Sequence, residues 1–207
     1  MPGDVAAAGD AARPLLDAKH RARELTVQES RRAIRSCATA IRAVHRGEFD
    51  EARRLIDEAA ALLSEIDSAL GEQHDIRYAG FHTDAQKEFA EANLTLAFVA
   101  EQPLPDARSL GDDVAPYLNG MAEAASELRR QTLDCLRRGD VERAETLLGS
   151  MDEVYSMLVT IDYPDAITGG LRRTTDALRA VLERTRGDVT TAIVAARLQA
   201  AVRQAGA

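Results

Sequence analysis

Residues 46–52, with the sequence Arg-Gly-Glu-Phe-Asp-Glu-Ala, and residues 138–144, with the sequence Arg-Gly-Asp-Val-Glu-Arg-Ala, share the pattern that decides the fold. In each stretch a glycine follows a long helix-favouring segment, and an acidic residue then opens another one. Glycine often ends a helix, and an acidic side chain near a helix start stabilises the positive end of its dipole. The two stretches therefore predict two antiparallel helical hairpins. They lie too far apart to be copies in an array of about 34-residue repeats.

Apolar residues recur three and four positions apart along nearly the whole chain, as they do in amphipathic helices. No proline occurs between Pro14 and Pro103, and no stretch alternates strictly between apolar and polar residues. We therefore expect an all-α, single-domain bundle of mostly long antiparallel helices over residues 11–205, after a flexible N-terminus at residues 1–10. The expected long helices cover residues 12–46, 49–70, 81–101, 114–138, 141–161 and a last segment from residue 171, which follows a short element that starts at Pro164.

The net charge of -8 restricts the partners of this protein. An acidic protein does not attract a phosphate backbone from a distance, so a nucleic-acid site must be a local basic patch. No apolar run is long enough to span a membrane, and we expect a cytoplasmic protein with no membrane partner. Cys37 and Cys135 lie far apart on apolar helix stripes, which predicts two free, buried cysteines.

Two glutamates, Glu88 and Glu91, stand out because they lie three positions apart in an otherwise core-forming helix. Their Cβ atoms are then about 5–6 Å apart. Both flank Phe89 and Ala92 of the apolar stripe, so they sit at the edge of the buried face. Joined by a third carboxylate from another helix, they can hold Mg²⁺ or Mn²⁺, ions that prefer oxygen ligands. The alternative is a pair of ordinary surface glutamates.

Residues 150–158 supply candidates for the third carboxylate, because Asp152 and Glu153 flank the apolar face of that helix. Basic residues are candidates for phosphate contacts. Arg31 and Arg35 lie near one face of the first helix, where they can follow a nucleic-acid backbone or form an ordinary solvated face. A second pair, Arg172 and Arg173, follows the break at residues 169–170.

Three segments together resemble the translin family, which includes translin and translin-associated factor X. The first contains Phe81-His82 and Lys87-Glu88-Phe89-Ala90-Glu91-Ala92. The second is Glu153-Val154-Tyr155-Ser156. The third contains Asp162-Tyr163-Pro164 and Gly170-Leu171-Arg172-Arg173-Thr174-Thr175-Asp176. The resemblance extends from about residue 17 to about residue 190 and is closer to factor X and to archaeal members than to translin itself.

This resemblance implies a seven-helix, all-α subunit in a hollow homo-oligomer, typically an octamer, that binds single-stranded RNA or DNA. In members that keep the acidic residues it also implies a Mg²⁺-dependent endoribonuclease. By position, Glu88 and Glu91 match the two catalytic, metal-binding glutamates of factor X. The third position is Glu153, or Asp152 if the alignment shifts by one residue. The nucleic-acid contacts that we expect are His82, Lys87, Arg31, Arg35, Arg172 and Arg173.

Two other functions remain open at this level. The first is a non-catalytic oligomer that binds single-stranded nucleic acid through its arginine-rich face. The second is a metal-binding helical bundle that resembles phosphate-transport regulators, which also hold metals in acidic clusters.

Overall fold

The computed structural model describes residues 5–71, 73–111 and 113–205. All of its regular elements in these ranges are helical, which confirms the predicted all-α fold. The long helices are α1 (Val5–Arg46), α2 (Phe49–Leu70), α4 (Gly80–Val99), α5 (Val114–Arg138), α6 (Val141–Leu158) and α8 (Leu171–Ala205). Shorter elements are α3 (His74–Arg77), the 3-10 turn η1 (Arg108–Leu110) and α7 (Asp165–Thr168).

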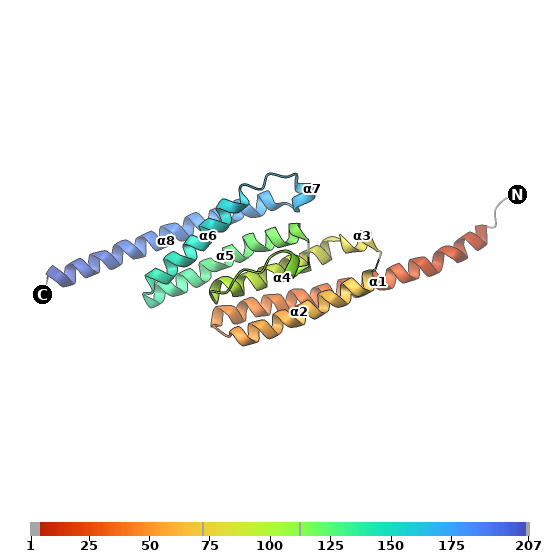
Figure 1. Ribbon diagram of the computed structural model, residues 1–207, viewed down its shortest axis with the longest axis horizontal. Helices are drawn as coiled ribbons and strands as arrows, with labels where there is room; N and C mark the ends of the chain where they lie inside the picture. The colour runs from red at the N-terminus through yellow and green to blue at the C-terminus, as the bar shows by residue number, and fades with distance from the viewer. Residues whose placement is uncertain (1–4, 72, 112, 206–207) are drawn as a thin grey trace.

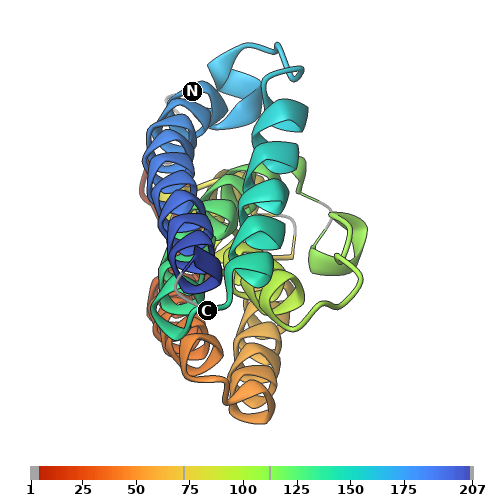
Figure 2. The same ribbon diagram turned by 90° about the vertical axis from the view of Figure 1, so that its left-hand side faces the viewer.

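The helices form three layers, as the view along the bundle shows (Figure 2). The hairpin of α1 and α2 lies on one side and the pair of α6 and α8 on the other. Between them, α4 packs against α1 and α5, while α5 also contacts α6 and α8. The two central helices therefore have neighbours on both sides, and polar side chains at their contact are partly removed from solvent.

Both predicted hairpins end their first helix in the same way. In the α1–α2 turn, Gly47 has φ +76° and its N–H donates to the Val44 carbonyl, while the Glu48 N–H donates to Ala43. The α5–α6 turn has the same pair of bonds. Gly139 has φ +79° and its N–H donates to the Leu136 carbonyl, while the Asp140 N–H donates to the Cys135 carbonyl. Only glycine adopts this left-handed conformation without strain, which is why the local sequence was sufficient to place both turns.

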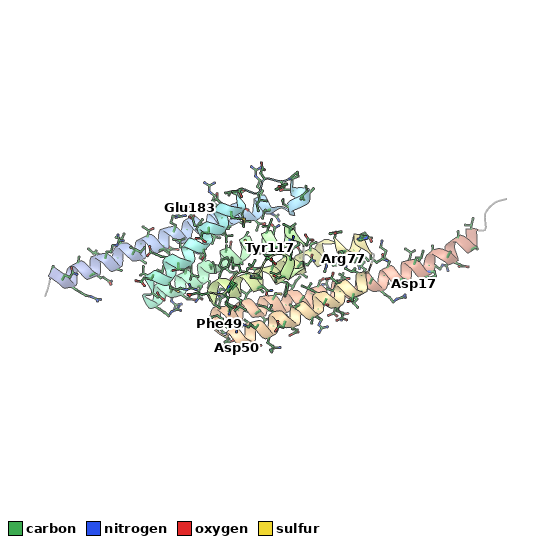
Figure 3. All side chains as sticks on the ribbon, viewed as in Figure 1. Asp17, Phe49, Asp50, Arg77, Tyr117 and Glu183 are labelled. Atoms are coloured by element: carbon green, nitrogen blue, oxygen red, sulfur yellow. The ribbon has the colours of Figure 1, made fainter. Side chains whose placement is uncertain are left out.

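Two helices extend beyond the bundle at opposite ends of the molecule (Figure 1). The N-terminal part of α1 carries Asp17, while Phe49 and Asp50 mark the turn at its other end (Figure 3). Because α1 begins at Val5, it includes residues 5–10 of the predicted flexible segment, whose residues 1–4 lie outside the described ranges. At the other end, the last turns of α8 are exposed. None of the described helices is both long and apolar enough to cross a membrane.

Candidate metal centre

Three carboxylates meet between α4 and α5, and we call this group the acidic cluster: Glu88 and Glu91 of α4 and Glu123 of α5. One oxygen from each residue can be chosen so that all three lie within 4.8 Å of one another. Within residues 5–71, 73–111 and 113–205 this is the one set of at least three acidic, histidine or cysteine side chains with such spacing. The structure thus brings together two of the predicted metal ligands and adds a third that the sequence analysis did not select.

The third carboxylate owes its position to Gly120, one helical turn before Glu123. A Cβ atom at Gly120 would stand 2.6 Å from the Lys87 carbonyl oxygen, 2.9 Å from the Ala90 Cβ and 3.0 Å from the Glu91 nitrogen. The backbones of α4 and α5 therefore touch at the level of the cluster, which only glycine permits. This close approach places Glu123 opposite the two glutamates of α4.

Burial makes the negative charge of the cluster costly. Glu91 is 8% exposed, and its burial, with further contributions from Glu88, Glu123 and Glu127, raises the pKa of its carboxyl from 4.5 to about 8. Burial also raises the pKa of Glu88, although Lys87 partly opposes this shift. Carboxylates held together in this way repel one another when ionised, and a cation between them relieves that repulsion. Their oxygen chemistry, spacing and charge fit a hard divalent cation such as Mg²⁺ or Mn²⁺.

Lys87 supplies part of the missing charge. Its Nζ lies 2.7 Å from Glu123 Oε2 and 3.5 Å from Glu88 Oε1. Burial is the largest single influence and disfavours the charged ammonium. The hydrogen bond to Glu123 and the charges of Glu123, Glu88 and Glu91 together outweigh it, so the pKa of Lys87 lies above its usual value. By family resemblance this lysine is a predicted nucleic-acid contact. In the structure it is bound to the acidic cluster, where one positive charge faces three carboxyl groups.

A histidine and a cysteine of α1 lie near the acidic cluster. The His45 Nε2 is 2.9 Å from Glu127 Oε2, and this hydrogen bond lowers the pKa of Glu127. Cys37 is buried, and burial together with Glu88 and Glu91 raises the pKa of its thiol to about 12. Without a cation nearby, this thiol is therefore protonated at neutral pH. Cys37 and Cys135 are both free and buried, as predicted.

The predicted third ligand does not belong to the cluster. Glu153 is exposed on α6, and the Asp152 Oδ1 accepts a hydrogen bond of 2.7 Å from Arg186 of α8. The physical reason is the order of the layers, because α5 packs against α4 whereas α6 packs chiefly on α5 and α8. The structure therefore replaces Glu153 and Asp152 by Glu123 as the third carboxylate beside Glu88 and Glu91.

The predicted nucleic-acid contacts have different surroundings. His82 is 0% exposed, and neither ring nitrogen has a hydrogen-bond partner. Its burial does not fit the predicted role as a nucleic-acid contact. Arg31 and Arg35 are exposed one turn apart on α1. Arg172 and Arg173 are exposed at the start of α8, but they line different hollows, and only that of Arg173 adjoins the acidic cluster.

Comparison with known proteins identifies the family, although no family model matches the chain. Two solved structures, of AfC3PO and of its complex with duplex RNA, are 30% identical to it, with TM-scores of 0.82 and 0.81. The matches cover 90% of this chain and 97% and 96% of theirs, and C3PO proteins are of the translin type. The chain belongs to the translin family. This result confirms the resemblance to the translin family that the sequence shows. The alternative, a bundle that resembles phosphate-transport regulators, is set aside.

Two further proteins are similar to this chain. NeC3PO, at 19% identity and a TM-score of 0.77, shares the fold over 93% of this chain and 98% of its own. An uncharacterized protein of Methanocaldococcus jannaschii is 28% identical over 178 residues, which cover 84% of this chain and 78% of the relative.

Proposed function

We propose that this translin-family protein binds single-stranded RNA and cleaves it as a Mg²⁺- or Mn²⁺-dependent endoribonuclease. The observation that carries the proposal is the acidic cluster, because three carboxylates within 4.8 Å include one, Glu91, that is buried against like charges. When bound there, a divalent ion would polarise the phosphodiester and activate the attacking water. The residues that would hold it are Glu88, Glu91 and Glu123.

The side chains around the cluster have defined roles in this proposal. Gly120 keeps α4 and α5 in contact and so fixes the spacing of the carboxylates. Lys87, already in contact with Glu123 and Glu88, can exchange these partners for a substrate phosphate. His45 orients Glu127 by its hydrogen bond at the next turn of α5. These residues bind and position groups, and none of them has to be the nucleophile.

RNA as the ligand is supported by one relative and by the exposed cations. AfC3PO, at 30% identity, was solved with duplex RNA. In this acidic chain the phosphates must meet local positive charge, which Arg31, Arg35 and Arg173 offer at exposed positions. The proposed substrate is single-stranded RNA, and single-stranded DNA is a further proposed ligand. A binding assay should compare both with duplex RNA.

Assembly into a hollow homo-oligomer, an octamer by family resemblance, is also part of the proposal. Val194, Leu198 and Val202 lie four positions apart on α8, each more than half exposed, on the part of the helix that extends past the bundle (Figure 1). At the opposite end, Leu15 and Leu16 of α1 are also exposed. Apolar stripes on projecting helices favour burial against other subunits.

The cleavage assay that tests this proposal uses a short single-stranded RNA with Mg²⁺, with Mn²⁺ or with EDTA. The wild type should cut the RNA only with a divalent ion, and Glu91→Gln should lose activity by at least a hundredfold while its mass in solution is unchanged. Equal cleavage by the two proteins would rule out the acidic cluster as the catalytic site.

A non-catalytic nucleic-acid-binding oligomer is the second candidate. It is favoured by Lys87, which bonds to Glu123 and can neutralise part of the cluster without any metal. This candidate predicts salt-sensitive binding of single strands and no cleavage with either ion.

A further inference from the structure

A cavity of about 490 Å³ opens beside the acidic cluster, where the start of α5 meets α4, α7 and α8. Its wall includes Thr83, Asp84 and Lys87 of α4, Asn119 and Glu123 of α5, and Arg173 of α8. We call this cavity the Arg173 pocket. Since Lys87 and Glu123 line it, a ligand that fills the pocket lies in contact with the acidic cluster.

The far wall of the pocket is fixed to α5 by one buried amide. The Asn119 Nδ2 donates to the carbonyl oxygens of Ala115, at 2.9 Å, and Thr168, at 2.8 Å. Its Oδ1 accepts a bond of 2.7 Å from the Thr174 hydroxyl. These three bonds tie α7 and the first turn of α8 to the helix that carries Glu123. The distance between Arg173 and the acidic cluster is therefore set by the fold.

The polar groups of the pocket define the class of its ligand. Within the described part of the chain the Arg173 guanidinium has no ion pair or hydrogen bond, so it is available for a phosphate. Asp84 is exposed, and Asp113 also lines the wall, which offers acceptors for ribose hydroxyls or base amino groups. Tyr78 lies at the pocket with 67% of its surface exposed and provides a face for base stacking.

We propose that the Arg173 pocket binds one nucleotide of the RNA next to the phosphodiester at the acidic cluster. Arg173 holds the outer phosphate of that nucleotide and Tyr78 stacks on its base. The volume lies within the range of about 300–1,000 Å³ that is usual for small-ligand sites. The inference rests on the proposed endoribonuclease function and adds that the pocket fixes which bond of the strand reaches the carboxylates.

The test uses matched pairs of variants in the full-length protein. Arg172 and Tyr163 are exposed like Arg173 and Tyr78 but line a separate hollow around residues 158–176. Binding of 5′-AMP and 5′-UMP is measured by calorimetry without divalent ions. We expect Arg173→Gln to weaken binding at least tenfold and Tyr78→Ala several-fold, while Arg172→Gln and Tyr163→Ala stay within twofold of the wild type.

Cleavage kinetics separate this inference from the proposed function. With single-stranded RNA and Mg²⁺, Arg173→Gln should raise KM about tenfold and leave kcat within threefold. If the wild type cleaves RNA but Arg173→Gln binds the monophosphates as well as Arg172→Gln does, the pocket assignment is wrong and the endoribonuclease proposal stands. If the wild type cleaves nothing yet Arg173 is required for monophosphate binding, the proposed function fails and the pocket remains a nucleotide site. Absence of monophosphate binding by the wild type at millimolar concentration also overturns the inference.

Discussion

Gly120 of α5 lies directly against Lys87 of α4, since a Cβ atom at position 120 would stand 2.6 Å from the Lys87 carbonyl oxygen. The obstacle is backbone, which cannot rotate aside as a side chain does. We expect Gly120→Ala to push the two helices apart and to lower the free energy of unfolding by about 1–3 kcal/mol. Because Glu123 follows one turn later, this variant should also lose Mg²⁺-induced stabilisation. Urea unfolding with and without Mg²⁺ measures both effects.

A matched control for this variant is Gly149→Ala. Gly149 is an exposed glycine inside α6, and a Cβ atom there meets nothing within 4 Å. Alanine should therefore be neutral or stabilise the protein by up to about 1 kcal/mol. Similar unfolding energies for the two variants would show that the helix contact at Gly120 is not tight.

The raised pKa of Glu91 predicts how stability depends on pH. Between pH 4.5 and about 8 the folded protein keeps a proton on Glu91 that the unfolded chain has lost. The contribution of Glu91 to stability therefore falls as pH rises through this window, and Glu91→Gln should remove that decline. Because metal binding needs the ionised carboxylate, the rise in Tm caused by Mg²⁺ should be larger at pH 8 than at pH 6. An equal rise at both pH values would contradict this account.

Lys87 competes with a divalent ion for Glu123 and Glu88. Replacing it by methionine keeps an unbranched side chain, one atom shorter, and removes the charge. We expect Lys87→Met to lower Tm without metal, since the cluster loses the positive charge that lies against Glu123 and Glu88. The same variant should bind Mg²⁺ several-fold more tightly, as measured by titration of Tm or by calorimetry. An unchanged Mg²⁺ affinity would show that the lysine and the ion do not share a site.

His82 predicts a pH effect of opposite sign. Burial lowers the pKa of its imidazole, although the Asp67 carboxylate, 3.9 Å away, partly opposes this. Below about pH 6.5 the unfolded chain takes up a proton more readily than the folded protein, so acidification should destabilise the wild type. His82→Leu should be more stable relative to the wild type at pH 5.5 than at pH 8, with RNA affinity unchanged. A large loss of RNA affinity would instead restore His82 as a contact residue.

Local signals determined how much of this fold was predictable. The bounds of α2 and α5 match the predicted helices at both ends. A glycine with positive φ lies shortly before each of these helices and another directly after it, so the sequence marks both ends. The four-residue helix α3 was missed, since one turn carries no periodicity. Glu88 and Glu91 could be singled out because their spacing and apolar neighbours lie within one helix.

The third carboxylate depended on information that no single helix contains. Which acid faces α4 is set by the contact of Gly120 with the α4 backbone, a relation across helices. One signal in the sequence could have identified Glu123. Gly120 lies inside α5 one turn before this acid, on the face of the helix opposite its polar surface. His82 was misplaced for the same reason, because its burial arises from packing between elements.

The most direct test of the central claim compares two isosteric substitutions, Glu123→Gln and Glu153→Gln, in Mg²⁺-dependent cleavage of one single-stranded RNA. The structure places Glu123 in the acidic cluster and Glu153 on the exposed face of α6. We predict that Glu123→Gln loses cleavage by at least a hundredfold and that Glu153→Gln retains it within twofold. Retained activity in Glu123→Gln, or its loss in Glu153→Gln alone, would contradict the assignment of the metal centre.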